Sequence, residues 1–150
     1  MALTEGSINN YRPSGKPPKS VPLADGVKVF RGGIIMGLGA GYNAPANSVT
    51  PAGARVRGVA LENVDNTAGS AGDKSVLIDN GGAQSKVFTN TQITQANVGD
   101  SVNINEDNSI YVSGAGTTAV LAGEIGEYIS GTNMGTNACW ITLKPEGVAS

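Results

Sequence analysis

The sequence predicts an all-β protein, a barrel or a sandwich of short strands, and three observations support this prediction. Glycine makes up 22 of the 150 residues, whereas aromatic residues account for 5% and charged residues for 15% of the chain. Glycine, Asn and Asp favour tight turns, while Val, Ile and Thr suit the pleated surface of a sheet. Nowhere do apolar residues recur at the helical spacing of i, i+3, i+4 and i+7 for more than one turn.

Residues 1–26 are predicted to form an extended, proline-rich N-terminal arm. Four prolines lie within ten residues, mixed with Lys, Ser and Gly: Pro13, Pro17, Pro18 and Pro22. The segment shows no hydrophobic period, so it cannot bury enough apolar surface to fold alone and favours an extended, polyproline-like geometry. When ordered, the arm is expected to lie across its own domain or across a neighbouring subunit.

Residues 27–145 are expected to form a single β domain, and residues 146–150 a short C-terminal tail. In the first half, strands are predicted at residues 27–31, 34–36, 55–61 and 75–78, with a loop over residues 63–74. Residues 43–45 (Asn-Ala-Pro) predict a turn. Phe30 and Ile34 are assigned to the core of the domain.

The second half contains the clearest hairpin of the sequence. Residues 101–105 alternate strictly between polar and apolar, Glu106-Asp-Asn108 predicts a turn, and residues 109–112 return. Further strands are predicted at 86–90, at 139–143, and as one or two strands within 117–129, broken at Gly123 and Gly126. Residues 92–98 fit either one helical turn or an extended segment. Ile104 and Trp140 are assigned to the core.

The chain offers few residues for catalysis, and no enzymatic activity or cofactor is expected. It has no histidine, so a Ser-His-Asp or Cys-His arrangement cannot be assembled within it. Its one cysteine, Cys139, lies in an apolar strand and is expected to be buried and inert. Zinc requires several His or Cys ligands, which are absent. A pair of catalytic carboxylates is not excluded, but no spacing among the twelve acidic residues indicates one.

Two stretches resemble ligand-binding loops, but neither completes its pattern. RGGIIMGLGAGY, residues 31–42, lacks the third glycine of a dinucleotide-binding loop, and Asn43-Ala-Pro45 after it prevents a helix from beginning there. Asn103, Asn105, Asp107 and Ser109 have the spacing of the start of a calcium loop, without its glycine and its final Glu. The same spacing fits a hairpin whose polar residues face water. No metal site is expected.

Charge is unevenly distributed along the chain, whose formal net charge is −2. Residues 1–57 carry a net charge of +5 and residues 58–150 a net charge of −7. Such a chain can meet neighbouring copies through complementary patches, or its sparse charges can simply be solvated. No nucleic acid partner is expected. The N-terminus shows no signal peptide and no segment reaches the length of a membrane helix, so no membrane partner is expected.

Several stretches resemble the small decoration, or cement, proteins on the heads of tailed bacteriophages. They are ADGVKVFRGG at 24–33, VRGVALENVD at 56–65, VGDSVNINEDNSIYV at 98–112, VLAGEI at 120–125 and the closing WITL at 140–143. The resemblance implies a non-enzymatic small β-barrel or β-tulip-like domain. It implies binding to the major capsid protein on the outer capsid surface of the virion, commonly as a homotrimer that bridges neighbouring capsomers.

The residues expected to make capsid or subunit contacts are six cations and one tyrosine. They are Tyr11, Arg12, Lys16 and Lys19 in the arm, followed by Arg31, Arg55 and Arg57. The alternative is a carbohydrate- or receptor-binding β module of a phage tail or spike. One Trp and four Tyr in the whole chain are few for a sugar-binding surface.

Overall fold

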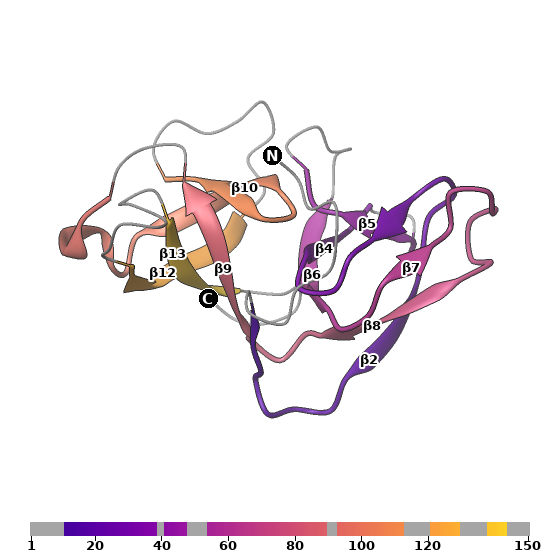
Figure 1. The fold of residues 1–150 in the computed structure, drawn as a ribbon, viewed down its shortest axis with the longest axis horizontal. Helices are drawn as coiled ribbons and strands as arrows, with labels where there is room; N and C mark the ends of the chain where they lie inside the picture. Colours follow the sequence, from indigo (N-terminus) through magenta and orange to yellow (C-terminus); the bar gives the residue numbers. More distant parts are fainter. Residues whose placement is uncertain are drawn as a thin grey trace.

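The computed structural model confirms the all-β prediction. It describes residues 11–38, 41–47, 54–89, 93–112, 121–129 and 138–143. Within these ranges the chain forms thirteen strands and one short 3₁₀ helix, Gln95–Asn97. The strands form two lobes that lie side by side (Figure 1). No helix in the described ranges is long and apolar enough to cross a membrane.

The first lobe, called here the barrel lobe, is a closed β-barrel. Its strands pair in the order β9–β11–β10–β12–β13, and β13 pairs again with β9, which closes the ring. Their bounds are β9 (Gln84–Thr89), β10 (Ser101–Glu106), β11 (Ser109–Tyr111), β12 (Leu121–Tyr128) and β13 (Ala138–Leu143). The pairing of β10 with β11 is the predicted hairpin. Of the one or two strands predicted within 117–129, residues 121–128 form one, which runs through Gly123 and Gly126.

The second lobe is a five-stranded antiparallel sheet with a small two-stranded ribbon beside it. The sheet order is β2 (Lys19–Pro22), β8 (Ser75–Asp79), β6 (Arg55–Ala60), β4 (Ile34–Gly37) and β5 (Asn43–Pro45). The ribbon pairs β3 (Lys28–Val29) with β7 (Val64–Asp65). Leu23, directly after β2, forms a parallel bridge to Asn43 of β5, so the two outer strands of the sheet curl toward each other.

The prediction of a turn at Asn43–Pro45 is wrong, because tertiary contacts make this segment a strand. Its residues pair with β4, and the Asn43 side-chain amide donates to the Pro22 carbonyl at 2.8 Å. The Ala24 amide donates to the Asn43 carbonyl at 2.9 Å. Asn and Pro favour turns locally, but here their backbone completes the edge of a sheet.

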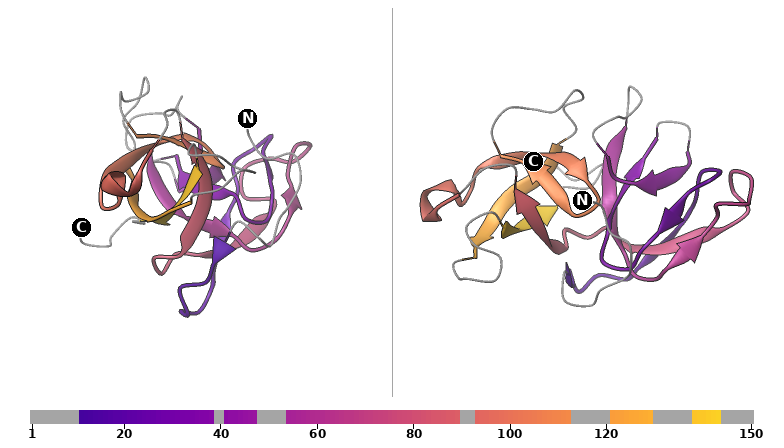
Figure 2. Two further views of the ribbon diagram at one scale, coloured as in Figure 1. Left: turned by 60° about the vertical axis from the view of Figure 1, so that its left-hand side comes forward. Right: turned by 45° about the horizontal axis from the view of Figure 1, so that its top comes forward.

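The two lobes share one hydrophobic core through β4. All four residues of β4 are buried, so both faces of this strand are covered. Ile34 and Met36 pack with the barrel interior, including Ile104 and Ile141, whereas Ile35 packs into a separate cluster inside the second lobe. The right-hand view of Figure 2 shows β4 and β6 on the side of the second lobe that faces the barrel. The apolar run of RGGIIMGLGAGY is therefore the predicted buried strand.

Two of the four residues assigned to the core are not in it. Ile34 and Ile104 are fully buried, as predicted, but Phe30 and Trp140 are half-exposed. Only Lys28–Val29 of the predicted strand 27–31 is paired, and Val29 supplies its buried side chain. In β13 the alternating positions Cys139, Ile141 and Leu143 are buried, and Ala138 at its start is buried too, so the alternation from Cys139 onward turns Trp140 outward.

Strand curvature is produced by bulges at glycines in both lobes. Gly58 in β6 and Gly123 in β12 each have φ of +156° and lie where the register with a neighbouring strand shifts. A Cβ at Gly58 would collide with the Asp79 carbonyl, and one at Gly123 with the Thr142 carbonyl. No other residue type fits these positions without displacing the neighbouring strand.

Candidate contact surface at the N-terminal strap

Residues 11–22 cross from one lobe to the other and are called here the strap. Its first strand, β1 (Tyr11–Arg12), pairs with β9 of the barrel lobe, and its second strand, β2, pairs with β8 of the second lobe. The proline-containing segment 13–18 connects them (Figure 1). Of the two partners considered for the arm, the structure places residues 11–26 on the chain's own sheets. The remainder of the arm, residues 1–10, and the predicted tail, residues 146–150, lie outside the described residues.

Asp79, at the end of β8, holds the strap by accepting hydrogen bonds from it. Oδ2 accepts from the Tyr11 hydroxyl at 2.5 Å and from the Ser14 amide at 2.9 Å. Oδ1 accepts from the Ser14 hydroxyl at 2.6 Å and from the Gly81 amide at 3.1 Å. Asp79 is only 3% exposed, so these four donors replace water around its carboxylate.

These contacts shift the protonation of both partners. Burial opposes ionisation of Asp79, but the donors from Ser14, Tyr11 and Gly81 outweigh it and hold the pKa of this carboxyl below its ordinary value. Burial and the hydrogen bond to Asp79 raise the pKa of the Tyr11 hydroxyl. The pair therefore consists of a carboxylate and a neutral phenol over the ordinary pH range.

Arg12 fixes the strap to the outer wall of the barrel. Its guanidinium lies 3.9 Å from the centroid of the Trp140 ring, a stacked cation–π geometry. The same group forms an ion pair with Glu127 at 2.7 Å and donates to Gln84 Oε1 at 3.3 Å. Lys86 lies on the same wall, with its ammonium 6.0 Å from the Trp140 ring centroid. Trp140 thus belongs to the strap contact and not to the core.

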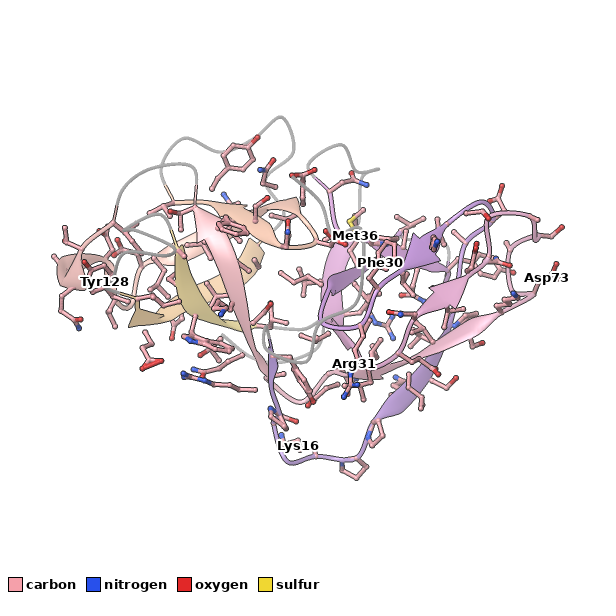
Figure 3. The ribbon with its side chains drawn as sticks, in the orientation of Figure 1. Lys16, Phe30, Arg31, Met36, Asp73 and Tyr128 are labelled. Atoms are coloured by element: carbon pink, nitrogen blue, oxygen red, sulfur yellow. The ribbon has the colours of Figure 1, made fainter. Side chains whose placement is uncertain are left out.

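Lys16, Lys19 and Arg31 lie around the turn that follows Asp79. The stem of Lys16 packs against Gly81, where an added Cβ would lie 2.7 Å from Lys16 Cδ. Lys19 pairs in register with Ile78, the residue before Asp79. The positive charge of Arg31 lowers the pKa of the Tyr11 hydroxyl, although burial and Asp79 outweigh this effect. Figure 3 shows Lys16 and Arg31 on the same side of the joint between the lobes.

Arg55 and Arg57 belong to a different part of the surface. Arg55 begins β6 and pairs with Gly37, whereas the Gly32 amide next to Arg31 donates to Ala60 at the other end of β6. Five strand residues separate these ends by roughly 17 Å. Both arginines also interact with other groups of the protein. Of the seven predicted contact residues, five gather at the strap and these two do not.

Sequence reasoning missed Asp79 and Phe88 and placed Trp140 in the core. Asp79 begins an Asp-Asn-Gly-Gly stretch, which predicted only a turn. Phe88 points outward from β9 and is 47% exposed. The alternation Gln84–Ser–Lys–Val–Phe88 could have placed Phe88 on the outer face together with Lys86.

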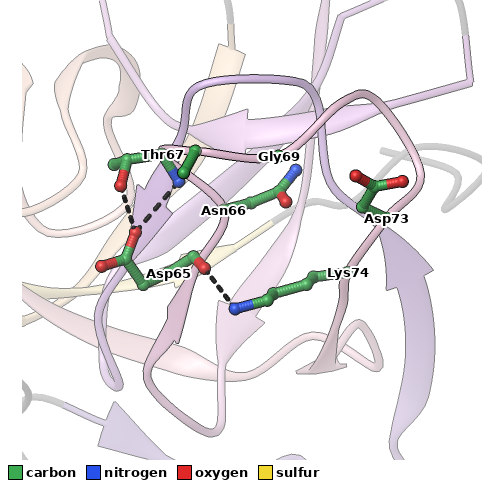
Figure 4. A pocket seen from close by; sticks show the side chains of 7 residues that line it. Asp65, Asn66, Thr67, Gly69, Asp73 and Lys74 are labelled. Atoms are coloured by element: carbon green, nitrogen blue, oxygen red, sulfur yellow. Dashed lines mark hydrogen bonds between the residues drawn. The ribbon is translucent and has the colours of Figure 1, made fainter.

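An open cavity of about 370 Å³, lined mainly by polar residues, lies at the far end of the second lobe, in the loop after β7 (Figure 4). It is lined by Asp65, Asn66, Thr67, Ala68, Gly69, Asp73 and Lys74. The carboxylate of Asp65 accepts from the Thr67 hydroxyl, which holds its pKa below the ordinary value. Lys74 donates to the Asp65 carbonyl at 2.8 Å. Asn66 donates to Ala24 and Ser70, and its own oxygen is buried beside Gly69.

The other sequence candidates have structural explanations. The Asn105 amide donates to the Ser109 hydroxyl at 2.9 Å across the β10–β11 hairpin, and Asp107 is buried. Among the described residues, no group of three His, Cys, Asp or Glu could hold a metal ion. Cys139 is fully buried in β13, as predicted, and burial raises the pKa of its thiol to about 12.

Neither a protein-family model nor a curated protein sequence matches this chain.

Proposed function

We propose that this protein is a capsid cement protein, which binds the outside of an assembled phage capsid and stabilises it by bridging neighbouring capsomers. The observation that carries the proposal is the convergence of Tyr11, Arg12, Lys16, Lys19 and Arg31 along the strap and the joint between the lobes. These residues were selected from the sequence as contact candidates, and the fold brings them to one surface. The resemblance to phage head decoration proteins supports the same function.

In this proposal the protein acts by binding and not by chemistry. The strap is already ordered on its own sheets by Asp79 and by Trp140, so binding does not have to order its backbone again. Ordering a free arm costs about 1–2 kcal/mol per residue. Many copies bound to a repeating lattice, with a homotrimer as the proposed unit and the major capsid protein as the partner, then add their modest affinities together.

Sedimentation with undecorated heads of the phage that encodes the chain tests the function. The purified protein is mixed with heads, and heads with bound protein are pelleted and quantified. We expect saturable binding at a fixed number of copies per head and greater resistance of decorated heads to heat or low salt. Heads that pellet without the protein at micromolar concentrations, or that gain no resistance, contradict the proposal.

A carbohydrate- or receptor-binding module of a tail or spike is the second candidate, and the cavity around Asp65 and Asp73 supports it. Carboxylates, an amide and an ammonium line this cavity, and such groups bind sugar hydroxyls. The ring of Trp140, by contrast, is covered by Arg12 on one face. Binding on a glycan array that is lost in Asp73→Ala, together with no binding to heads, would favour this candidate.

A further inference from the structure

Three cations around the Asp79 turn have no ion-pair partner within the part of the chain that the structure describes. Lys16, Lys19 and Arg31 are all exposed, and none of them forms a salt bridge with another described residue. Arg12, in contrast, is paired with Glu127. Lys16, Lys19 and Arg31 are called here the cationic band. It lies across the strap and the joint between the two lobes.

The backbone under each cation of the band is fixed, while its charged group is free. Lys16 follows Ser14, whose hydroxyl accepts from the Lys16 amide at 3.2 Å, and Lys19 is paired in β2. The Arg31 amide donates to Asn63 Oδ1 at 2.8 Å. A partner therefore meets cations whose backbone positions are set in advance, so only the freedom of their side chains is lost on binding.

The two nearby acids, Asp79 and Glu62, offset the charge of the three cations only in part. The Asp79 carboxylate is buried, and both of its oxygens accept hydrogen bonds from the strap and from Gly81. Glu62, on the turn beside Asn63, accepts from the Leu77 amide and pairs with no cation of the band. The surface around Asp79 thus carries an excess of positive charge on a chain whose net charge is −2.

We infer that the cationic band docks on an acidic patch of a partner protein, and we assign that partner, on the basis of the proposed function, to the capsid shell. Charge complementarity supports a negatively charged partner. A protein fits better than a nucleic acid, because affinity for nucleic acid depends on neutralising many phosphates, the band holds only three cations and the chain as a whole is negative.

Charge reversal in the band, compared with a matched reversal outside it, tests the inference. Lys16→Glu and Lys19→Glu change the band. Lys28→Glu reverses a charge outside it, on β3 of the second lobe, where exposed Lys28 pairs in register with Asp65 and has its ammonium 5.4 Å from the Phe30 ring centroid. We expect each band variant to bind heads about threefold to fivefold more weakly and the double variant about tenfold more weakly, with wild-type affinity in Lys28→Glu. Binding should weaken as salt is raised from about 0.05 M to 0.5 M.

The outcomes separate this inference from the proposed function. If the wild type binds heads and all three single variants bind equally well, or equally poorly, the cement function stands and the band is not the docking surface. If the wild type does not bind heads, the cement function fails.

In that case, binding to poly-L-glutamate at low salt tests the inference separately. Loss of this binding in the band variants alone supports an acidic polypeptide partner. The inference is overturned if the wild type does not bind poly-L-glutamate, if Lys28→Glu loses this binding as well, or if the wild type binds double-stranded DNA more tightly than poly-L-glutamate. Circular dichroism of each variant confirms its fold.

Discussion

Asp79 and Tyr11 form the hydrogen bond that contributes most directly to holding the strap. The Tyr11 hydroxyl donates to a buried carboxylate, and its loss leaves one lone pair of Asp79 without a donor. We expect Tyr11→Phe to lower the free energy of unfolding by about 1–3 kcal/mol, measured by urea denaturation. Tyr42→Phe is the control, since Tyr42 is exposed, and it should change stability by less than about 0.5 kcal/mol. Equal stability of Tyr11→Phe and the wild type contradicts the assignment.

The ionisation of Asp79 gives the folded protein a defined dependence on pH. Its pKa is lower in the folded state than in the unfolded state, so the unfolded state binds more protons as the pH falls through this range. The stability contributed by the ionised Asp79 carboxylate is therefore complete above about pH 4 and is lost as the pH falls below it. Asp79→Asn should be less stable at pH 7 and should lose less stability between about pH 5 and 2.5. Parallel pH profiles of the two proteins, measured by denaturation, would show that the prediction is wrong.

At single positions, the sequence could identify candidate core and contact residues, but it could not identify the residues that they touch. Alternation along β13 identifies two faces, and it does not say which face meets the barrel interior, so Trp140 was assigned to the wrong side. Asp79 reaches Tyr11 across 68 residues of chain. No local pattern encodes a contact of that separation. The position of Arg31 beside the strap depends on the same long-range packing.

At the level of elements, the strap has two parts: β1 is attached to the outside of the barrel lobe, and β2 supplies side chains to the core of the second lobe. β1 lies on the outside of the barrel lobe, where Tyr11 packs against the core while still partly exposed, whereas Val21 in β2 and Leu23 after it are fully buried in the second lobe. We expect deletion of residues 1–18 to leave a folded protein with a lower thermal midpoint, because Asp79 and Trp140 lose their strap partners. Deletion of residues 1–23 should abolish the cooperative transition. Circular dichroism melts distinguish the two results.

The truncation prediction has a clear contrary outcome. If the protein without residues 1–18 does not fold, the prediction is wrong, and the contacts of β1 are essential for the stability of the sheets. If deletion of residues 1–23 leaves a cooperative transition, the second lobe does not need its outer strand. The boundary of the arm at residue 26 would then correspond to a structural boundary.

Elements with strong local patterns were predicted from sequence, and those defined by distant contacts were not. The hairpin of β10 and β11, the buried strand β4 and strand β6 follow from alternation, apolar runs and turn residues. Strand β5 was missed, since Asn43 and Pro45 favour turns and become a strand only through β4 and residues 22–24. The ambiguous segment 92–98 contains one 3₁₀ turn, capped by Thr94.

At the scale of the whole molecule, the shared core predicts that the two lobes unfold together. Ile34 lies in the second lobe but packs with residues of the barrel interior. We expect Ile34→Ala to destabilise the protein by about 2–5 kcal/mol and to speed hydrogen exchange of β6 and β13 amides alike. Leu77→Ala, on the exposed face of β8, is the control. Faster exchange confined to the second lobe would contradict a shared core.

The class of the fold follows from composition, but its division into two lobes does not. Frequent glycine and short alternating segments predict many strands. They do not indicate which strand closes the barrel or which face of β4 packs against the barrel interior. These features depend on pairings such as that of β13 with β9, between segments about fifty residues apart. The charged contact residues could be identified from the sequence, but their gathering around Asp79 could not be predicted.

The contact of Arg12 with Trp140 also has a practical consequence. Trp140 is the one tryptophan of the chain, so the indole emission of the protein comes from a single ring that the strap covers. A guanidinium stacked on that ring changes its environment, and separation of the strap would expose the ring to water. The emission maximum and the intensity of the fluorescence therefore report, without any added label, whether the strap remains on the barrel lobe when the protein binds its partner.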